Sequence, residues 1–434
     1  VAARRADADD VLHTVLTVQL IGIDTDGRHA HTAAHNADGA ALIAAGVAEH
    51  TAHIGDEADI LQKGLRDELC AQRIAGHQNG LGEIALFRAV MRGRHKSTLL
   101  YFVILVDIVY HTFPVCGKLI EKFFVKEVFA MQLPHHCTLC PRACGADRAA
   151  GQRGFCGADD TLRVARAALH HWEEPCLSGD PDAATGSGTV FFSGCTLRCC
   201  YCQNYPISQG EVGKAITAER LADIFMQLQN GGAKNLNLVT ASHYLPWVTE
   251  ALDAARAAGF ALPVVYNTGG YETVEAVRAL AGYVDIWLAD YKYASPALAK
   301  ELSAAQDYPQ VAHAAIRQML LQTGAPVYDA DGYLQKGVIV RHLALPGHSD
   351  DSLAVLQRLA DLRQETGVSF VPSLMSQFTP FYRAAEHGLG RRITTYEYRK
   401  VVDRAIALGL TDGYMQEKSS AKEEYTPPFD LSGI

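Results

Sequence analysis

Three cysteines at the spacing C-x3-C-x2-C constrain this chain more than any other feature. They are Cys195, Cys199 and Cys202, and Tyr201 stands directly before the last of them. Three thiolates can bind three irons of a [4Fe–4S] cube, which leaves the fourth iron free to bind a small molecule. A loop can turn three cysteines toward one cluster, whereas a packed strand or helix would point them in several directions. The spacing therefore predicts an iron–sulfur site with one open position.

Two other interpretations of the triplet stay open at this point. Cysteine is among the residue types most often found in protein cores, so the three could be buried thiols. The triplet could also bind a structural zinc, although zinc usually takes four protein ligands arranged as two pairs.

Length, charge and cysteine usage limit the class of protein. A chain of 434 residues, 48% of them hydrophobic, can form two or three domains. Its formal net charge of −9 does not favour binding to nucleic acid or to an anionic membrane. The most apolar run, 99–106, is well short of the ~20 residues that span a bilayer. With an odd count of eleven cysteines and no secretory signal, we expect a cytoplasmic protein that binds neither nucleic acid nor membrane.

The chain divides into three parts by composition. Residues 1–130 contain alanine- and histidine-rich stretches without sustained periodicity, and we interpret them as a poorly structured or spurious extension, the alternative being an unfamiliar domain. Residues 131–185 form a cysteine-rich segment that starts at Met131. Residues 186–434 contain the regular pattern and are expected to form the core and its C-terminal elements.

Strands and helices alternate from Thr189 onward. Strands are predicted at 189–193, 235–239, 262–266, 284–289, 337–345, 368–372 and 413–416. Helices are predicted at 217–230, 246–258, 272–280, 310–322, from Ser349, and at 394–408, with a capping box at Thr394 and Glu397 and a hairpin turn at 331–332. Helical crossovers imply a parallel sheet, and about six units are too few for an eight-fold barrel. The predicted fold is α/β, a partial (β/α)6 barrel with an N-terminal cysteine-rich segment, and its site lies at the carboxyl ends of the strands.

Several phrases from Cys137 to the C-terminus carry a family resemblance. They are CPRACG at 140–145, FSGC at 192–195, YCQN at 201–204, YNTGGY at 266–271, DYK at 290–292 and RHLALPG at 341–347. With the cysteine triplet they resemble the radical S-adenosylmethionine (SAM) superfamily, and within it uncharacterised iron–sulfur proteins related to pyruvate formate-lyase activating enzymes. The resemblance covers about 300 residues.

The resemblance implies cofactors and chemistry. Cys195, Cys199 and Cys202 would hold a [4Fe–4S] cluster whose open iron chelates SAM, and Tyr201 would lie beside the adenine. An electron from the cluster then breaks a sulfur–carbon bond to give methionine and a 5′-deoxyadenosyl radical, which abstracts hydrogen from a substrate. The protein contributes position and the exclusion of water.

The chain departs from these relatives at one cofactor contact. Activating enzymes carry a Gly-Gly-Glu-like segment after the second strand, whereas this chain has Val-Thr-Ala-Ser-His at 239–243. Thr240, Ser242 and His243 could supply hydrogen bonds from the same strand end. A structural role is the alternative for His243.

Three charged residues fit the cofactor site better. Asp290 and Lys292 share one face after an apolar strand and resemble the family's Asp-x-Lys pair, an ordinary surface ion pair being the alternative. Arg341 lies in an apolar strand and needs an anion, either the SAM carboxylate or a buried acidic partner. Asn267 and Gln377 follow strands and are weaker candidates.

A second group of cysteines precedes the triplet. Cys137, Cys140, Cys144 and Cys156 have the spacing C-x2-C-x3-C-x11-C. Four thiolates would complete a closed site, so this group predicts a second iron–sulfur cluster or a structural zinc, with unmetallated thiols as the alternative.

The preferred function is an oxidoreductase that makes a substrate radical. A protein or peptide substrate is expected, and by resemblance a glycine in a partner protein is the first candidate. A flavodoxin or ferredoxin would donate the electron. The rival hypothesis is a non-catalytic iron–sulfur protein that transfers electrons or acts as a scaffold.

Overall fold

The computed structural model describes residues 133–180, 182, 184–416 and 426–434, all within one compact unit, Glu121–Ile434. The predicted extension at 1–130 lies outside the described residues, as do Cys70 and Cys116.

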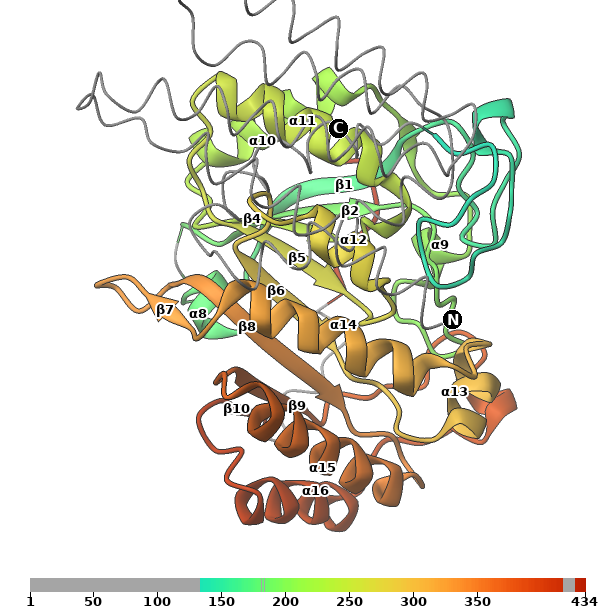
Figure 1. Ribbon diagram of the computed structural model, residues 1–434, viewed down its shortest axis with the longest axis vertical. Helices are drawn as coiled ribbons and strands as arrows, with labels where there is room; N and C mark the ends of the chain where they lie inside the picture. The colour runs from blue at the N-terminus through green and yellow to red at the C-terminus, as the bar shows by residue number, and fades with distance from the viewer. Residues whose placement is uncertain (1–132, 181, 183, 417–425) are drawn as a thin grey trace, which may run out of the picture. The chain divides into compact units, whose positions relative to one another are not determined.

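One sheet organises the described residues. Its order is β10-β9-β8-β6-β5-β4-β2-β1-β3, with β7 paired to β8 (Figure 1). The strands are β1 Arg163–His170, β2 Ser187–Phe192, β3 Lys214–Ala215, β4 Leu236–Val239, β5 Val264–Thr268, β6 Ile286–Asp290, β7 Val327–Tyr328, β8 Leu334–Leu343, β9 Val371–Met375 and β10 Tyr414–Met415. From β2 to β10 the neighbours along this path pair in parallel, whereas β1, β3 and β7 pair antiparallel. The predicted α/β partial barrel is confirmed, and β1 and β3 are additional strands that the sequence pattern did not predict.

Helices connect the parallel strands and pack on one another outside the sheet (Figure 1). They are α8 Pro175–Ser178, α9 Tyr205–Ser208, α10 Ala218–Asn230, α11 Leu245–Ala257, α12 Val274–Ala279, α13 Pro296–Ser303, α14 Tyr308–Thr323, α15 Ser349–Thr366 and α16 Thr395–Ala407, with 3-10 turns η2 Arg148–Ala150, η3 Ser242–Tyr244 and η4 Ala384–His387. The predicted N-cap at Thr217 and the capping box of Thr394 and Glu397 are both present.

Some predicted boundaries were wrong. The sequence did not predict α13, and Ser349 is the first residue of α15 rather than its cap, a position that His348 occupies. Strands β5, β6 and β9 begin two to three residues later than predicted, at Val264, Ile286 and Val371. Pairing with neighbouring strands, which local propensity does not encode, decides where a strand begins.

The parallel strands are buried on both faces. In β6, Trp287 and Ala289 belong to the large core under the helices, whereas Ile286 and Leu288 pack in a second cluster. This second cluster also contains Cys176 and Leu177 of α8, so α8 packs against the inner face of the barrel. Side chains that alternate along each strand therefore supply two cores, and the inner one is closed by the short helix after β1.

The strand pairing determines which end of the barrel α8 closes. His170 at the end of β1 pairs with Ser187 at the start of β2. The chain that follows β1 therefore enters the barrel near the amino ends of the parallel strands, and Glu173, Glu174 and α8 follow at once. None of the helices in the described ranges is long and apolar enough to cross a bilayer.

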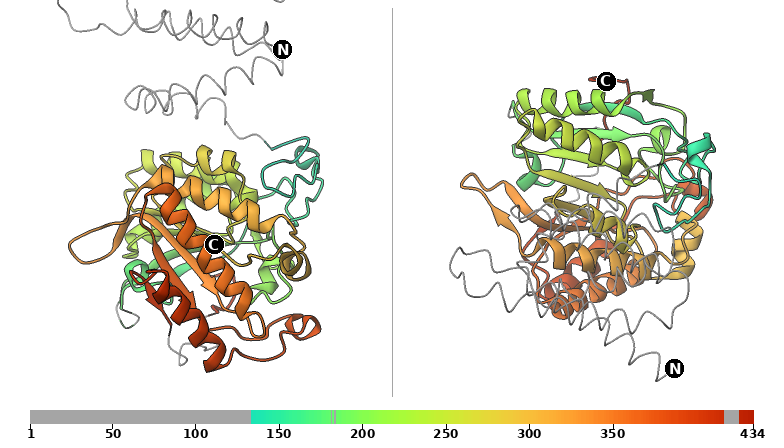
Figure 2. Two further views of the ribbon diagram at one scale, coloured as in Figure 1. Left: turned by 60° about the horizontal axis from the view of Figure 1, so that its bottom comes forward. Right: turned by 45° about the horizontal axis from the view of Figure 1, so that its top comes forward.

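Residues 133–162 form a loop-rich segment, which we call the cysteine-rich lobe (Figure 2, teal). Its only helical turn is η2, and two arginines attach it to the barrel. Arg148 is fully buried and donates to the carbonyls of Asp159 and His243. Arg142 donates to the carbonyls of Thr196 (2.8 Å), Leu197 (3.4 Å), Ser303 (2.7 Å) and Ala304. The lobe thus rests on the turn after β2 and on the end of α13.

The Arg142 contact predicts that a lysine cannot replace it. Arg142→Lys keeps the charge but loses the planar fork that reaches several carbonyls at once. We expect amide hydrogen exchange in 137–156 to accelerate about tenfold or more, because each charge-assisted hydrogen bond contributes about 1.5–3 kcal/mol. Arg153→Lys, at a residue whose side chain is 58% exposed, is the control and should change nothing. Equal exchange in both variants would contradict the anchoring role.

Candidate functional site

The cysteine triplet follows β2 directly, as the sequence predicted. A different element holds each sulfur. The backbone N–H of Leu197 donates to Cys195 Sγ (3.4 Å), Ser303 Oγ of α13 donates to Cys199 Sγ (3.0 Å), and Ser208 Oγ of α9 donates to Cys202 Sγ (3.3 Å). Three donors aimed at three sulfurs suit thiolates that carry negative charge, which is the form that binds metal.

The number of thiols in the triplet bears on which metal group it could bind. A structural zinc usually takes four protein ligands, whereas a [4Fe–4S] cube can bind three thiolates, each through a different iron, and keep its fourth iron open. Burial raises the pKa of Cys195 to about 11 and that of Cys202 to about 12, so iron would have to stabilise the thiolate forms. The triplet fits a [4Fe–4S] cluster.

A chain of buried hydroxyls leads from Tyr201 to the triplet. Tyr201 Oη lies 2.6 Å from Tyr293 Oη, which lies 2.7 Å from Ser303 Oγ, the donor to Cys199. When Cys199 is a thiolate, Ser303 must donate its only proton to sulfur, so Tyr293 donates to Ser303 and Tyr201 to Tyr293. The proton order is therefore fixed along the chain, and each bond polarises the next.

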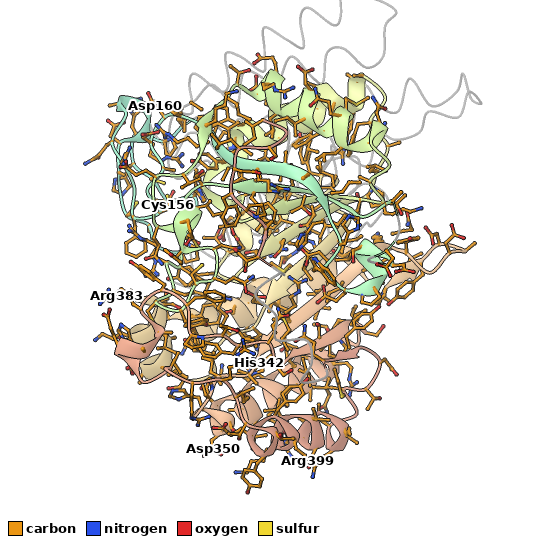
Figure 3. All side chains as sticks on the ribbon, turned by 180° about the vertical axis from the view of Figure 1, so that it is seen from behind. Cys156, Asp160, His342, Asp350, Arg383 and Arg399 are labelled. Carbon is orange, nitrogen blue, oxygen red and sulfur yellow. The ribbon has the colours of Figure 1, made fainter. Side chains whose placement is uncertain are left out.

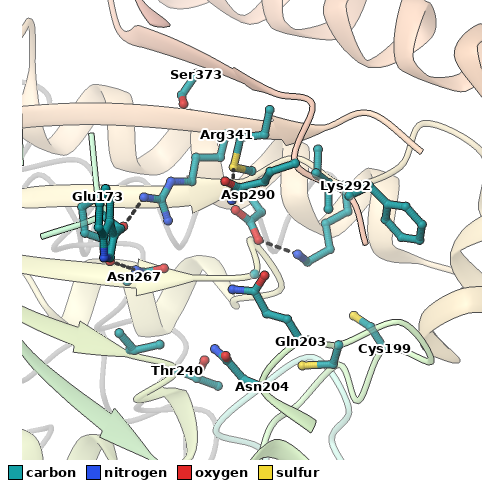
Figure 4. Close-up of a pocket in the computed structure, with 18 of the residues that line it drawn as sticks. Glu173, Cys199, Gln203, Asn204, Thr240, Asn267, Asp290, Lys292, Arg341 and Ser373 are labelled. Carbon is teal, nitrogen blue, oxygen red and sulfur yellow. Dashed lines mark hydrogen bonds and ion pairs between the residues drawn. The ribbon is translucent and has the colours of Figure 1, made fainter. Parts of the chain in front are cut away.

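A cavity of about 620 Å³ opens beside the triplet (Figure 4). Most of the residues predicted for the cofactor site line it: Cys195, Cys199, Cys202, Tyr201, Thr240, Asn267, Asp290, Lys292, Arg341 and Gln377. They come from the turn after β2 and from the ends of β4, β5, β6, β8 and β9. The structure thus brings together residues that span almost 200 positions of sequence.

Asp290 and Lys292 form an ion pair inside this cavity. Lys292 Nζ lies 2.5 Å from Asp290 Oδ2, and the two side chains are only 18% and 20% exposed. Burial alone would lower the pKa of Lys292, but the Asp290 carboxylate, with Tyr201 and Cys199 nearby, holds it well above its usual value. The pair is therefore charged and partly desolvated, unlike a surface ion pair.

Arg341 has anionic partners within the chain. It donates to Glu174 Oε1 (2.7 Å) and Oε2 (2.5 Å) and to Glu173 Oε2. Glu173 also accepts from Asn237 (2.9 Å) and Asn267 (3.3 Å), and both glutamates are at most 7% exposed. Burial alone would raise the pKa of Glu173, but the guanidinium of Arg341 holds it below its usual range. The acidic partner that the sequence left open for Arg341 is thus a pair of glutamates, and its contact with SAM stays a prediction.

The three candidate residues that follow β4, Thr240, Ser242 and His243, lie in different surroundings. Thr240 lines the cavity and has a φ of +60°, a left-handed conformation that strains a β-branched residue. Ser242 and His243 are buried outside the cavity lining. His243 Nε2 bonds the carbonyl of Ser193 (2.7 Å), and burial lowers its pKa to about 4. Of the three, only Thr240 is placed to meet a molecule in the cavity.

Ser242 instead contacts a buried acid. Glu272 Oε1 accepts from Ser242 Oγ and from Thr268 Oγ1, both at 2.5 Å. Its Oε2 is buried without a hydrogen-bond partner among the described residues. Burial raises the pKa of Glu272 to about 7, against hydroxyl bonds that lower it.

Sequence reasoning missed several residues of the cavity. Glu173 and Glu174 follow a strand that the pattern did not reveal, although two adjacent acids beside an apolar run were a usable signal. Ser303 lies in the helix that was not predicted. Ser373, Met375 and Gln416 line the cavity from β9 and the end of the described range after β10.

Comparisons with known proteins agree with this geometry. Residues 189–360 match the family described as the radical SAM superfamily, which implies a [4Fe–4S] cluster and SAM. The uncharacterized protein MJ0674 of Methanocaldococcus jannaschii is 28% identical over 294 residues, which is 66% of this chain and 79% of that protein.

Two solved structures also resemble the chain, both of SuiB from Streptococcus suis. SuiB bound to S-adenosylmethionine is 14% identical, with a TM-score of 0.36 over 51% of this chain and 48% of SuiB. SuiB bound to the precursor peptide SuiA is 14% identical, with a TM-score of 0.34 over 49% of this chain and 43% of SuiB. The chain thus spans about half the length of SuiB.

The hydroxyl chain predicts a shift in the cluster's reduction potential. Ser303→Ala removes a hydrogen bond that favours the more negative, reduced cluster, so the midpoint potential should fall. Tyr293→Phe, which keeps Ser303, should shift it less and in the same direction. Potentiometric titration followed by EPR measures both. Tyr283→Phe, which removes a remote bond to Asp253, is the control. An unchanged potential in Ser303→Ala would refute the role of this bond.

Glu272 predicts a pH-dependent loss of stability. Its pKa is raised in the folded state, so the folded form retains the proton that the unfolded chain releases above about pH 4.5. Stability therefore declines as the pH rises from about 4.5 to about 7, by up to about 3 kcal/mol. Glu272→Gln should remove this decline, and urea titrations near pH 5 and pH 8 measure it. Glu275→Gln, at an exposed position, should retain it; the same decline in both variants would disprove the assignment.

Proposed function

We propose that this chain, which carries a radical SAM superfamily domain over residues 189–360, is an oxidoreductase that cleaves SAM reductively and abstracts hydrogen from a substrate. When bound, the cluster and SAM supply the electron transfer and the bond cleavage. The chain's own residues bind these groups, orient them and exclude water around them.

One observation carries the proposal. The cavity joins the three-cysteine turn to the charged pair of Asp290 and Lys292 (Figure 4). SAM carries an ammonium and a carboxylate, so a desolvated pair of opposite charges beside an open iron is suited to both groups. An electron carrier needs no such pair, which favours an enzyme over the electron-transfer alternative.

The hydroxyl and amide groups around the cavity complete the proposed cofactor site. Tyr201 and Asn267 line the cavity together with the charged pair, and Thr240 lies at the strained end of β4. We assign Tyr201 to the adenine side and Thr240 to the place of the Gly-Gly-Glu-like segment in related enzymes.

The cavity lining also includes residues that are not assigned to the cofactor. Ser373 and Met375 of β9 are among them, and Gln377 follows. We propose a protein or peptide substrate, to whose backbone Ser373 and Gln377 offer hydrogen-bonding groups. A glycine of a partner protein is the first substrate to test, by resemblance to activating enzymes.

We also propose a reducing cytoplasmic setting and a flavodoxin or ferredoxin as electron donor. Metal-binding thiolates must be kept reduced, and a one-electron carrier of low potential matches the chemistry.

Anaerobic reconstitution with iron and sulfide, then reduction in the presence of SAM, tests the function. Wild type should release 5′-deoxyadenosine and methionine, and Cys195→Ala should release neither. Lys292→Met should reduce 5′-deoxyadenosine at least tenfold, because it leaves Asp290 buried and unpaired.

Glu365→Gln is the matched control. It breaks an exposed ion pair with Arg317 and should leave product formation unchanged. If wild type binds iron but forms no 5′-deoxyadenosine, or if Cys195→Ala forms as much as wild type, the enzyme proposal fails and the electron-transfer alternative gains support.

A further inference from the structure

Four cysteines of the cysteine-rich lobe lie together, apart from the triplet. Cys144 is within hydrogen-bonding distance of Cys137, and the thiols of Cys137, Cys140 and Cys156 interact electrostatically. A Cβ built on Gly154 would lie 3.3 Å from Cys144 Sγ and 3.5 Å from Cys156 Sγ. The four thiols therefore form one interacting group, and the sulfurs of Cys144 and Cys156 both lie beside Gly154.

The backbone of the lobe curls around these sulfurs. The N–H of Gly145 donates to the carbonyl of Cys137 (3.1 Å), and the N–H of Cys137 donates to that of Ala146 (3.0 Å). Ala143 and Gly145 have φ values of +40° and +70°, which reverse the chain between Cys140 and Ala146. A left-handed alanine is strained and persists where its surroundings hold it. Cys137, Cys140 and Cys156 are at most 7% exposed.

This packing has no obvious support from regular structure. Residues 133–162 contain one 3-10 turn and no strand. Loop-rich segments of this length are ordinarily stabilised by a disulfide or a metal, and all four cysteines are free thiols here.

We propose that Cys137, Cys140, Cys144 and Cys156 bind a second iron–sulfur cluster, coordinatively complete, that exchanges electrons with the cluster of the triplet. Four thiolates could also bind a structural zinc ion, so the zinc content is one outcome of the test. Four protein ligands leave no open iron, so this site suits electron transfer rather than SAM binding.

The two sets are in direct contact. The N–H of Cys195 donates to the carbonyl of Cys156 (3.1 Å), and Arg198 donates to the carbonyl of Phe155 (3.1 Å). Cys156 belongs to the cysteine-rich lobe (Figure 3). Gly194 is required at this joint, since a Cβ there would lie 2.6 Å from the carbonyl oxygen of Cys156. The backbones of Cys156 and Cys195, joined by this one hydrogen bond, form a short covalent and hydrogen-bonded path for an electron between the two sulfurs. The step moves one electron from a reduced flavodoxin or ferredoxin through the second cluster to the first, and no bond forms or breaks.

Iron analysis of the full-length chain after anaerobic reconstitution tests the site. The triple variant Cys195→Ala, Cys199→Ala, Cys202→Ala should retain about four irons of the eight expected in wild type. Cys137→Ala with Cys140→Ala should also retain about four, and Cys176→Ala, outside both sets, should retain eight. If the triple variant contains no iron, and binds one zinc ion or no metal instead, the proposal of a second cluster is overturned.

EPR of the doubly reduced protein tests the electron exchange. Two neighbouring paramagnetic clusters should broaden each other's signals in wild type and in Cys176→Ala, whereas the triple variant and the Cys137→Ala, Cys140→Ala variant should each show a single unbroadened signal. Eight irons without such broadening would overturn the exchange. The inference rests on the proposed function for its partner cluster, but iron in the triple variant is independent of SAM cleavage, so the two can fail separately.

Discussion

The register of the parallel strands is the constraint on which the site depends. Pairing places Val239 opposite Asn267, Asn267 opposite Leu288, and Asp290 opposite Arg341, which in turn pairs with Ser373. Because side chains alternate along each strand, a shift of one residue would move this whole set to the helix-covered face. The polar groups of the cavity therefore occupy the inner face only because the apolar residues between them fill the outer core.

Burial of charge then determines what each polar group can do. Arg341 is balanced by Glu173 and Glu174 from the loop after β1, and Glu173 also accepts hydrogen bonds from Asn237 and Asn267. An unpaired guanidinium there would carry a large desolvation cost. With Arg341 satisfied, Asp290 and Lys292 are the charged pair on the cysteine side of the cavity (Figure 4). The cavity lining thus contains two groups of charge, Arg341 with its glutamates and the pair of Asp290 and Lys292.

The sequence allowed the repeating part of the fold to be predicted, and it identified residues that the structure brings together around one cavity. Hydrophobic alternation and caps such as Thr217 located the units of the barrel, and the spacing of Cys195, Cys199 and Cys202 carries its chemistry in one short segment. Glu173 and Ser303 were not predicted, because their roles depend on contacts across 168 and 104 positions, with Arg341 and Cys199. Ser242 and His243 were assigned by their place after β4, but η3 turns them toward Glu272 and Ser193.

Hydrogen bonds from the lobe, from α9 and from α13 hold the cysteine turn. The lobe is bonded both to the turn and to α13. Cys195 bonds the lobe through Cys156, Cys202 accepts from Ser208 of α9, and Cys199 accepts from Ser303 of α13. Arg142 of the lobe donates to the carbonyls of Thr196 and Ser303, so one guanidinium links the turn to the residue that donates to Cys199. A change in the lobe, such as a substitution of Arg142, would therefore alter the hydrogen bonds around the triplet. Because donors to sulfur raise the reduction potential of a cluster, the lobe would influence the energy of electron transfer to a cluster held by the triplet.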